Sequence, residues 1–219
     1  MGNKETLRKK AIETTARLEQ EDKIRSWHSG YYHRYFEGWT EIPELKPDGR
    51  GVRIRRVYTG EYYKADMSQK QRRGHKALCV LLVLLSLLLY VRASVMGLAS
   101  NTVWYVVFPQ VLALCGYLFL GWFLISKLSA PVLLTIREYR ETSKNLKLAG
   151  GLQSAVLALA AVNTLLHFAL SGGEGGEILA AVFYLLAGSA AFGVCWLEQR
   201  VKYLRVPNEN AALDGFRIE

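Results

Sequence analysis

The order of apolar and polar positions divides this chain of 219 residues into two parts. Residues 77–197 are almost wholly apolar apart from one charged stretch, whereas residues 1–76 are polar, charged and rich in aromatic side chains. A soluble core alternates apolar and polar residues at helix or strand period, while long unbroken apolar runs belong in a bilayer. The pattern therefore predicts an integral membrane protein of the all-α class.

Four apolar stretches can cross a bilayer as helices. The first unbroken run, 77–91, is too short for a hydrocarbon core of ~30 Å at ~1.5 Å per residue, so we extend it to Ala99 with Arg92 snorkelling or packed inside the bundle. Pro109 should kink the second span. The predicted spans are 77–99, 103–125, 151–170 and 178–197, with a loop at 126–149 and a tail at 198–219. Together they predict a four-transmembrane-helix bundle of two helical hairpins.

Basic residues are distributed unevenly among the connections. Of the 28 lysines and arginines, 27 lie before the first span, in the loop at 126–149 or in the tail, and only Arg92 belongs to the other side. The positive-inside rule then predicts that both termini are cytoplasmic, with two short outer hairpins. The excess of basic residues before the first span favours anionic headgroups, rather than nucleic acid, as partner. We expect a multi-pass protein of the bacterial cytoplasmic membrane.

The two halves of the chain resemble each other weakly. A shift of 77 residues brings Glu61 and Tyr62 onto Glu138 and Tyr139, and the first hairpin onto the second. Because both halves have the same orientation, this would be a parallel repeat. Hydropathy alone can also produce such a match, and both explanations stay open.

The region before the first span divides at about residue 30. Residues 1–30 predict a basic helix, and residues 31–76 predict an aromatic and basic juxtamembrane segment with a β-hairpin, strands near 37–44 and 52–59, around the turn sequence KPDGRG. An isolated hairpin is marginal in water, so it must lean on the membrane, the loop at 126–149 or another chain. In the loop at 126–149, the sequence predicts either an interfacial helix that starts at Pro131 with Ser129 as its cap, or a continuation of the second span. The residues expected to bind a partner are Trp39, Arg56, Tyr58, Tyr62 and Tyr63.

Catalytic and cofactor motifs are absent from the sequence. We find no zinc-protease, P-loop, hydrolase-elbow or dinucleotide pattern, and the three cysteines show no pairing or zinc spacing. His28 and His33 are more typical of aromatic packing than of a metal site. The N-terminus fits the short myristoylation pattern at Gly2, which a bacterial cell would ignore. We therefore expect neither a metal nor a cofactor.

Polar residues within the spans are few. No Asp, Glu or Lys lies in the middle of a span, which argues against an ion-coupled transporter or an intramembrane aspartyl protease. Gln110, Asn163 and His167 could line a polar path or simply bond neighbouring helices. Ser189 and Gly193 form a small-xxx-small pair that suits either internal packing or an oligomer interface.

These observations leave three functional hypotheses. The first is a non-enzymatic membrane subunit or scaffold that assembles with itself or with a partner complex through its helices and the cytoplasmic hairpin. The second is an uncoupled channel or transporter component. The third, an enzyme that uses His28, His33 or His75, has no accompanying nucleophile or metal constellation.

Overall fold

The computed structural model describes residues 37–45, 52–172 and 175–210. The predicted helix at 1–30, the turn at 46–51, Gly2, His28 and His33 lie outside these residues. The described chain forms two compact units. The helical bundle comprises residues 65–132 and 138–204, and the strand unit comprises the described parts of residues 1–64, 133–137 and 205–219.

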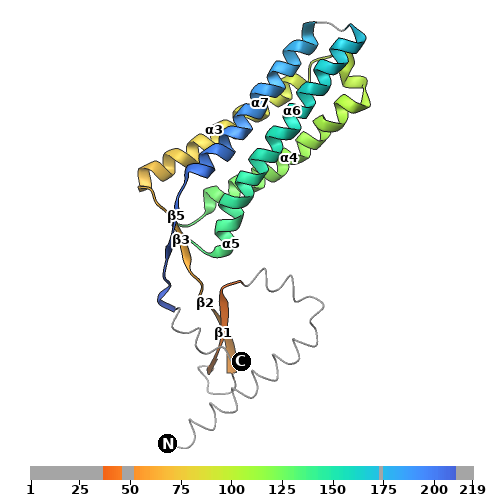
Figure 1. Cartoon of the computed structure of the whole chain (residues 1–219). Coiled ribbons are helices and arrows are strands. Elements are labelled where there is room, and N and C mark those ends of the chain that lie inside the picture. Colours follow the sequence, from red (N-terminus) through yellow and green to blue (C-terminus); the bar gives the residue numbers. More distant parts are fainter. Residues whose placement is uncertain (1–36, 46–51, 173–174, 211–219) are drawn as a thin grey trace, which may run out of the picture. The chain divides into compact units, whose positions relative to one another are not determined.

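Four helices of the bundle are long and apolar enough to cross a membrane, which confirms the prediction of four apolar helices (Figure 1). The described chain is mostly helical, as expected for a multi-pass membrane protein. Leucines exposed on the bundle, such as Leu88 and Leu118, are suited to contact with lipid chains. The four helices are α3 (Gln69–Ser94), α4 (Trp104–Ser129), α6 (Leu146–Ser171) and α7 (Gly175–Arg200).

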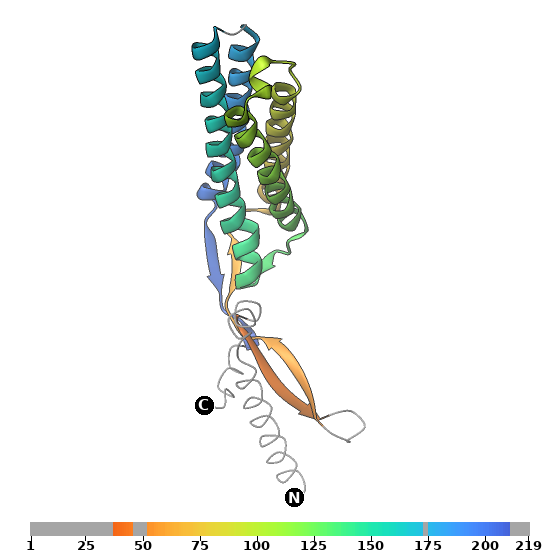
Figure 2. The ribbon, with the colours of Figure 1, turned by 90° about the vertical axis from the view of Figure 1, so that its right-hand side faces the viewer.

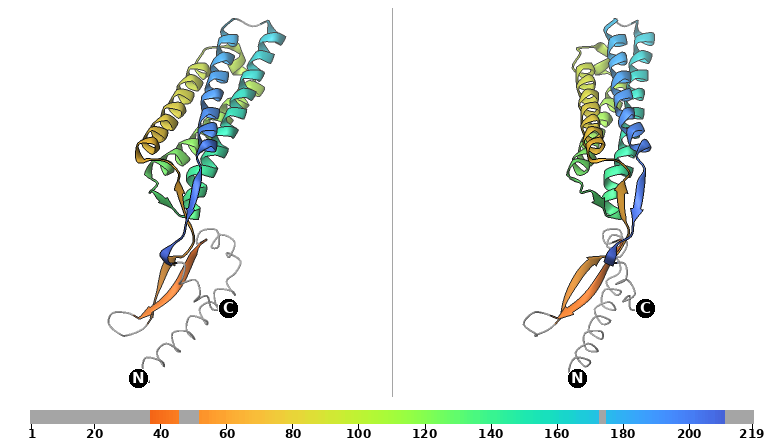
Figure 3. Two further views of the ribbon diagram at one scale, coloured as in Figure 1. Left: turned by 60° about the vertical axis from the view of Figure 1, so that its left-hand side comes forward. Right: turned by 90° about the vertical axis from the view of Figure 1, so that its left-hand side faces the viewer.

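Helix α7 is the most enclosed of the four, because it packs along both α3 and α6, while α4 packs mainly against α6 (Figure 2). The α3–α4 connection lies at the same end of the bundle as the end of α6 and the start of α7 (Figure 3). We call this the closed end, and the opposite end, where α3 begins and α7 finishes, the open end. Since α6 and α7 pack far more closely than α3 and α4, the two hairpins are not equivalent, and the parallel repeat stays a prediction.

Local signals explain where the helices begin and end. Ser68 caps α3 through a capping box: its Oγ accepts from the Gln71 amide at 3.3 Å, and Gln71 Oε1 accepts from the Ser68 amide at 2.9 Å. Gly172 ends α6 in the left-handed conformation, at φ +67°, and donates its amide to Phe168 O. Lys76 Nζ donates to Leu128 O at 2.9 Å, so a basic side chain of α3 satisfies a terminal carbonyl of α4.

Several sequence-based boundaries need correction. Helix α3 starts at Gln69 rather than 77, because its charged first two turns still form helical hydrogen bonds that hydropathy does not register, and it ends at Ser94 rather than Ala99. The helix predicted to start at Pro131 is wrong, because Pro131 follows the end of α4. Ser129 Oγ donates back to Ile125 O instead of capping a new helix. The chain continues through β4 (Leu133–Leu134), α5 (Ile136–Tyr139) and a π-helical segment η3 (Arg140–Asn145) into α6.

The strands form two small sheets. Antiparallel β1 (Trp39–Leu45) and β2 (Val52–Tyr58) pair in a register that sets Trp39 opposite Tyr58. A three-stranded sheet, which the sequence analysis did not predict, has the order β4–β3–β5, with β3 at Tyr62–Ala65 and β5 at Tyr203–Val206. Its strands come from three distant parts of the chain, so no local turn sequence predicts this sheet.

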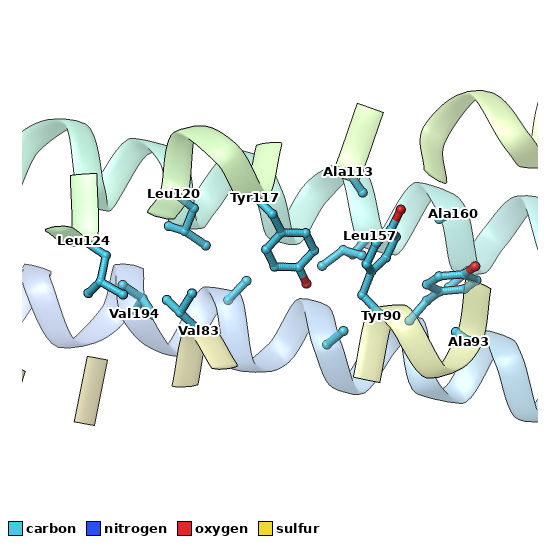
Figure 4. Close-up of a cluster of buried hydrophobic side chains, with 14 of the residues drawn as sticks. Val83, Tyr90, Ala93, Ala113, Tyr117, Leu120, Leu124, Leu157, Ala160 and Val194 are labelled. Atoms are coloured by element: carbon cyan, nitrogen blue, oxygen red, sulfur yellow. The ribbon is translucent and has the colours of Figure 1, made fainter. Parts of the chain in front are cut away.

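The axis of the bundle is filled with side chains (Figure 4). In its open half the apolar side chains on the axis include Val83, Leu120, Leu124 and Val194. Further along, Tyr90 and Tyr117 lie with their ring centroids 5.2 Å apart. Tightly packed interiors of this kind leave few voids larger than a water molecule.

Candidate functional site

Helix α7 carries two buried carboxylates, one near each end of the bundle. Glu177 lies in its first turn and is 2% exposed, and Glu198 lies in its last turn and is 3% exposed. A buried carboxylate is costly unless cations or hydrogen-bond donors surround it, so each marks a specialised environment. The sequence analysis had assigned Glu177 to a loop and Glu198 to the tail.

At the open end, Glu198 is held by side chains from three other parts of the bundle. Lys127 Nζ, at the end of α4, forms an ion pair with Glu198 Oε1. Ser143, in the π-helical segment η3, donates to Oε2 at 3.3 Å. A carboxylate near a helix C-terminus is disfavoured by the helix dipole, so these partners are what stabilise it there. The π-helical turn is the feature that brings Ser143 to this position, and such turns often occur at functional sites.

Two potential metal ligands on α3 complete this open-end cluster. His75 Nε2 lies 3.6 Å from Glu198 Oε1. Cys79, one helical turn later, has its Sγ 3.8 Å from His75 Nδ1 and 3.9 Å from Glu198 Oε1. The thiol and the carboxylate are fully buried, and all three residues can direct one ligand atom to within 4.8 Å of the others.

Tyr203 lies beside the open-end cluster, just beyond α7. Burial raises the pKa of its phenol to about 12, and the negative charge of Glu198 adds to this, while a hydrogen bond with Ser143 opposes it. Its ring packs edge-on against Tyr139 at 4.8 Å. The phenol therefore stays neutral throughout the physiological range.

At the closed end, Glu177 and His167 face each other. His167 Nε2 lies 3.6 Å from Glu177 Oε1, and the same oxygen accepts from the Ser100 amide at 3.3 Å. On the other side of the imidazole, Nδ1 lies 3.0 Å from the Tyr105 hydroxyl. This closed-end cluster joins α4, α6 and α7 through polar side chains.

Asn163 compensates for a backbone defect in α4. Pro109 has no N–H, so the carbonyl of Tyr105, four residues earlier, lacks its helical donor. Asn163 Nδ2 on α6 donates to that carbonyl at 2.6 Å. Asn163 and His167 thus lie on one face of α6 and both bond Tyr105, which is the arrangement expected of helix–helix hydrogen bonding.

Gln110 belongs to a separate network. Its Nε2 donates to Asn101 Oδ1 at 3.0 Å, and its backbone carbonyl accepts from the Tyr90 hydroxyl at 2.8 Å. Asn101 in turn donates to Met96 O and so holds the α3–α4 connection. Gln110 therefore has different hydrogen-bond partners from Asn163 and His167. Residues that line one polar path would be expected to share a network.

Near the middle of the bundle, hydroxyl groups bond within the protein. Ser86 Oγ donates to Ala187 O at 2.7 Å, and its second contact, 2.6 Å from the Tyr117 hydroxyl, is therefore as acceptor. The Tyr184 hydroxyl lies 3.2 Å from Ser94 Oγ. These bonds satisfy buried polar groups without water, as an apolar surrounding requires.

The small residues of α7 are used inside the bundle. A Cβ on Gly193 would meet Leu82 of α3 at 3.2 Å, and a Cβ on Gly188 would meet Ser154 O of α6 at 3.3 Å. Ser189 is exposed and bonds the Leu185 carbonyl of its own helix. The Ser189–Gly193 pair is therefore split, with Gly193 in an internal contact.

In the strand unit, the five residues expected to bind a partner occupy different environments. Tyr58 is buried, donates its hydroxyl to Glu61 O at 2.8 Å and accepts from the Ile136 amide at 3.0 Å. Trp39 packs edge-on against Tyr58 at 5.5 Å yet remains 41% exposed. Arg56 is exposed, and Tyr62 and Tyr63 are partly exposed. Tyr58 thus supports the unit from within, while the other four reach its surface.

Comparison of the chain with family models, curated proteins and solved structures finds no match in any of them. Functional arguments therefore rest on the chemistry of the residues themselves.

The sequence contains only a weak signal for the open-end cluster. His75 and Cys79 are four residues apart, a spacing that places two ligands on one helix face, whereas the spacing among the cysteines alone indicates no metal site. Glu198 is 119 residues beyond Cys79, and no local pattern connects them. Lys127 and Glu198 were placed outside the apolar spans because their charges end the hydropathy window, although the helices continue past both.

Proposed function

We propose that this chain is a non-enzymatic integral membrane subunit or scaffold that assembles with itself or with a partner membrane complex. The observation that carries the proposal is the filled axis of the bundle. Val83, Leu120 and Val194 occupy its open half, and the hydroxyls of Ser86 and Tyr90 beyond them donate to backbone carbonyls of the protein. A conduit needs polar groups that face a shared water path, so this packing favours an anchoring role over the uncoupled channel or transporter alternative.

The polar clusters are also better suited to holding helices together than to catalysis. Glu198 binds Lys127 and Ser143, and His167 is bonded to Tyr105, so these groups are engaged by the protein. General acid–base chemistry requires a group within reach of a substrate in a cavity. Fully buried side chains such as Glu198 instead favour the non-enzymatic assignment.

For orientation, we propose that the open end of the bundle faces the cytoplasm, with both termini on that side of a bacterial cytoplasmic membrane. The distribution of basic residues supports this, because Arg92 is the one lysine or arginine assigned to the opposite side. Lys70, Arg72 and Arg73 at the start of α3 would lie among anionic headgroups, where each contributes about 1 kcal/mol of attraction.

For the docking surface, we propose the strand unit rather than the helices. The close contacts of Gly188 and Gly193 are made within the bundle, which leaves the small-residue faces less available to a second copy. Trp39, by contrast, is a large aromatic side chain that is 41% exposed, and Arg56 on the paired strand is exposed as well. Tryptophan and arginine are the residue types most enriched at energetic centres of interfaces.

The experiment is affinity purification of the tagged full chain in mild detergent, with native mass spectrometry of the product. We expect a stable complex that Trp39→Ala disrupts and that Trp104→Ala, which truncates a tryptophan 78% exposed on the bundle, leaves intact. A chain that is monomeric under these conditions, or a complex insensitive to Trp39→Ala and Arg56→Ala together, would sink the proposal. A homo-oligomer that passes ions in liposomes would establish the channel alternative instead.

A further inference from the structure

The open-end cluster has the composition of a metal site. His75 supplies an imidazole, Cys79 a thiol and Glu198 a carboxylate, from two helices that cross at this end of the bundle. Thiolate and imidazole ligands select zinc-like ions, and carboxylate oxygen is a common third ligand. Calcium and magnesium are disfavoured, because they take oxygen ligands almost exclusively.

The spacing of the three groups suits one small ion. The sulfur lies 3.8 Å from His75 Nδ1 and 3.9 Å from Glu198 Oε1, and His75 Nε2 lies 3.6 Å from the same oxygen. An ion would take one of the two ring nitrogens, and one ligand atom of each residue lies within 4.8 Å of the others. In a tetrahedral zinc site with bonds of about 2.0–2.3 Å, neighbouring ligand atoms are about 3.3–3.6 Å apart. The ligand atoms therefore need to approach one another by up to about an ångström.

One of these ligands has an unmet bonding capacity. His75 Nε2 is buried and has no hydrogen-bond partner among the described residues. Its distance of 3.6 Å from Glu198 Oε1 exceeds that of a hydrogen bond, and the thiol contacts of Cys79 are long as well. Buried nitrogen atoms nearly always have a partner, and a ligand bound at Nε2 would supply one.

Lys127 is what keeps the carboxylate neutralised without an ion. Its ammonium group bonds Glu198 Oε1, the oxygen nearest to both His75 and Cys79. Ser143 bonds the other oxygen, Oε2, and so leaves the carboxylate one oxygen to offer to a ligand. Outer hydrogen bonds of this kind orient metal-binding carboxylates.

We propose that His75, Cys79 and Glu198 bind one zinc-like divalent cation, which displaces the Lys127 ammonium from Glu198. On binding, the S–H bond of Cys79 breaks, a sulfur–metal bond forms and the proton passes to solvent. Lys127 lies in the last turn of α4, where its long side chain can turn outward with its charge retained. Three protein ligands leave the fourth coordination position to water or to an external group.

The test is a titration of the purified, metal-stripped full chain with Co²⁺, which reports thiolate ligation by an intense charge-transfer band. We expect saturation at one ion per chain and displacement of the ion by Zn²⁺. Cys79→Ser should abolish the band while Cys195→Ser, at another buried free cysteine, should retain it. His75→Ala and Glu198→Gln should each weaken binding at least about tenfold.

The Co²⁺ affinity of the Lys127→Met variant distinguishes a metal site from a chance cluster of the three side chains. Because the variant removes a positive charge beside the ion, we expect it to tighten Co²⁺ binding by about tenfold or more. The proposal is overturned if the wild-type chain shows no thiolate–cobalt band, if the band survives Cys79→Ser, or if Lys127→Met binds Co²⁺ no more tightly. Circular dichroism and elution volume in detergent identify variants that remain folded, and the wild-type titration decides the matter even if some do not.

Discussion

Lys127 and Glu198 form an ion pair inside the bundle, between the last turn of α4 and the last turn of α7. The lysine side chain is 9% exposed and the carboxylate is 0% exposed. Removal of one member of such a pair leaves a buried charge without compensation, whereas removal of both leaves none.

The first prediction concerns this pair in the metal-free protein. Lys127→Met or Glu198→Gln alone should lower the free energy of unfolding by roughly 3–5 kcal/mol, and the double variant should lose clearly less than the sum. Unfolding in mixed micelles of mild detergent and dodecyl sulfate measures this. Strict additivity of the two losses would show that the contact contributes nothing.

The second prediction tests the repair of α4 by Asn163. Asn163→Ala should cost on the order of 1–3 kcal/mol, because the partly buried Tyr105 carbonyl then has no donor. Pro109→Ala restores a backbone N–H for that carbonyl, so Asn163→Ala should cost measurably less in the Pro109→Ala background. The same unfolding assay applied to the four chains gives the coupling, and equal costs in both backgrounds would contradict the account.

The third prediction concerns the space beside Gly116. A Cβ there would lie 2.0 Å from Gln153 Oε1, so Gly116→Ala must displace an amide that donates to Ala113 O at 3.1 Å. We expect a loss of about 1–3 kcal/mol in the free energy of unfolding. Gly121→Ala on the same helix is the matched control, since a Cβ there meets nothing within 4 Å. Both variants behaving alike would show that the amide moves without cost.

The fourth prediction uses two adjacent glycines of α6. A Cβ on Gly150 would lie 3.0 Å from Ala191 O and 3.3 Å from the Cys195 amide, whereas one on Gly151 would meet only Cys195 Sγ at 3.8 Å. Gly150→Ala should therefore push α6 away from α7 and lower the melting temperature in detergent, while Gly151→Ala should leave it unchanged or slightly higher. If Gly151→Ala were the more damaging change, the described α6–α7 contact would be wrong.

The fifth prediction is a pH dependence. The pKa of Tyr203 is about 12 in the folded chain against an ordinary value of 10, so the folded state disfavours the phenolate. The stability linked to this neutral phenol is fully present below pH 10 and is lost as pH rises towards 12, by up to about 2 kcal/mol. Tyr203→Phe should flatten the decline of the unfolding free energy between pH 10 and 12. An unchanged slope in that variant would assign the decline to other groups.

The four apolar helices could be predicted because a bilayer selects long apolar runs, a property that composition alone reveals. Their ends could not, since Lys76 and Lys127 belong to helices whose hydrogen bonding continues beyond the apolar stretch. The sheet that includes β3 and β5 was missed for a different reason. Strands β3 and β5 are four residues long and lie about 140 positions apart, and β4 has two residues, so neither periodicity nor turn chemistry marks their pairing.

The candidate site was less predictable than the fold. Asn163 and His167 can be identified from the sequence because they are polar residues four apart in an apolar helix. Their common partner, Tyr105, cannot, because an aromatic residue near the end of a span is typical of the membrane interface. Glu177 and Glu198 were overlooked because a charge at the border of a span is normally solvated. Whether such a carboxylate is buried depends on which side chains of the neighbouring helices pack against it, and the sequence of one helix does not contain that information.

The placement of the two carboxylates on α7 has a mechanical consequence. Glu177 and Glu198 are 21 positions apart, which on an α-helix is about 31 Å, close to the hydrocarbon thickness of ~30 Å. Each is tied to other helices, Glu177 by the Ser100 amide and Glu198 by Lys127, so α7 cannot slide along its own axis without breaking both attachments. In a thinner or thicker bilayer, α7 would therefore tilt together with the helices to which it is attached.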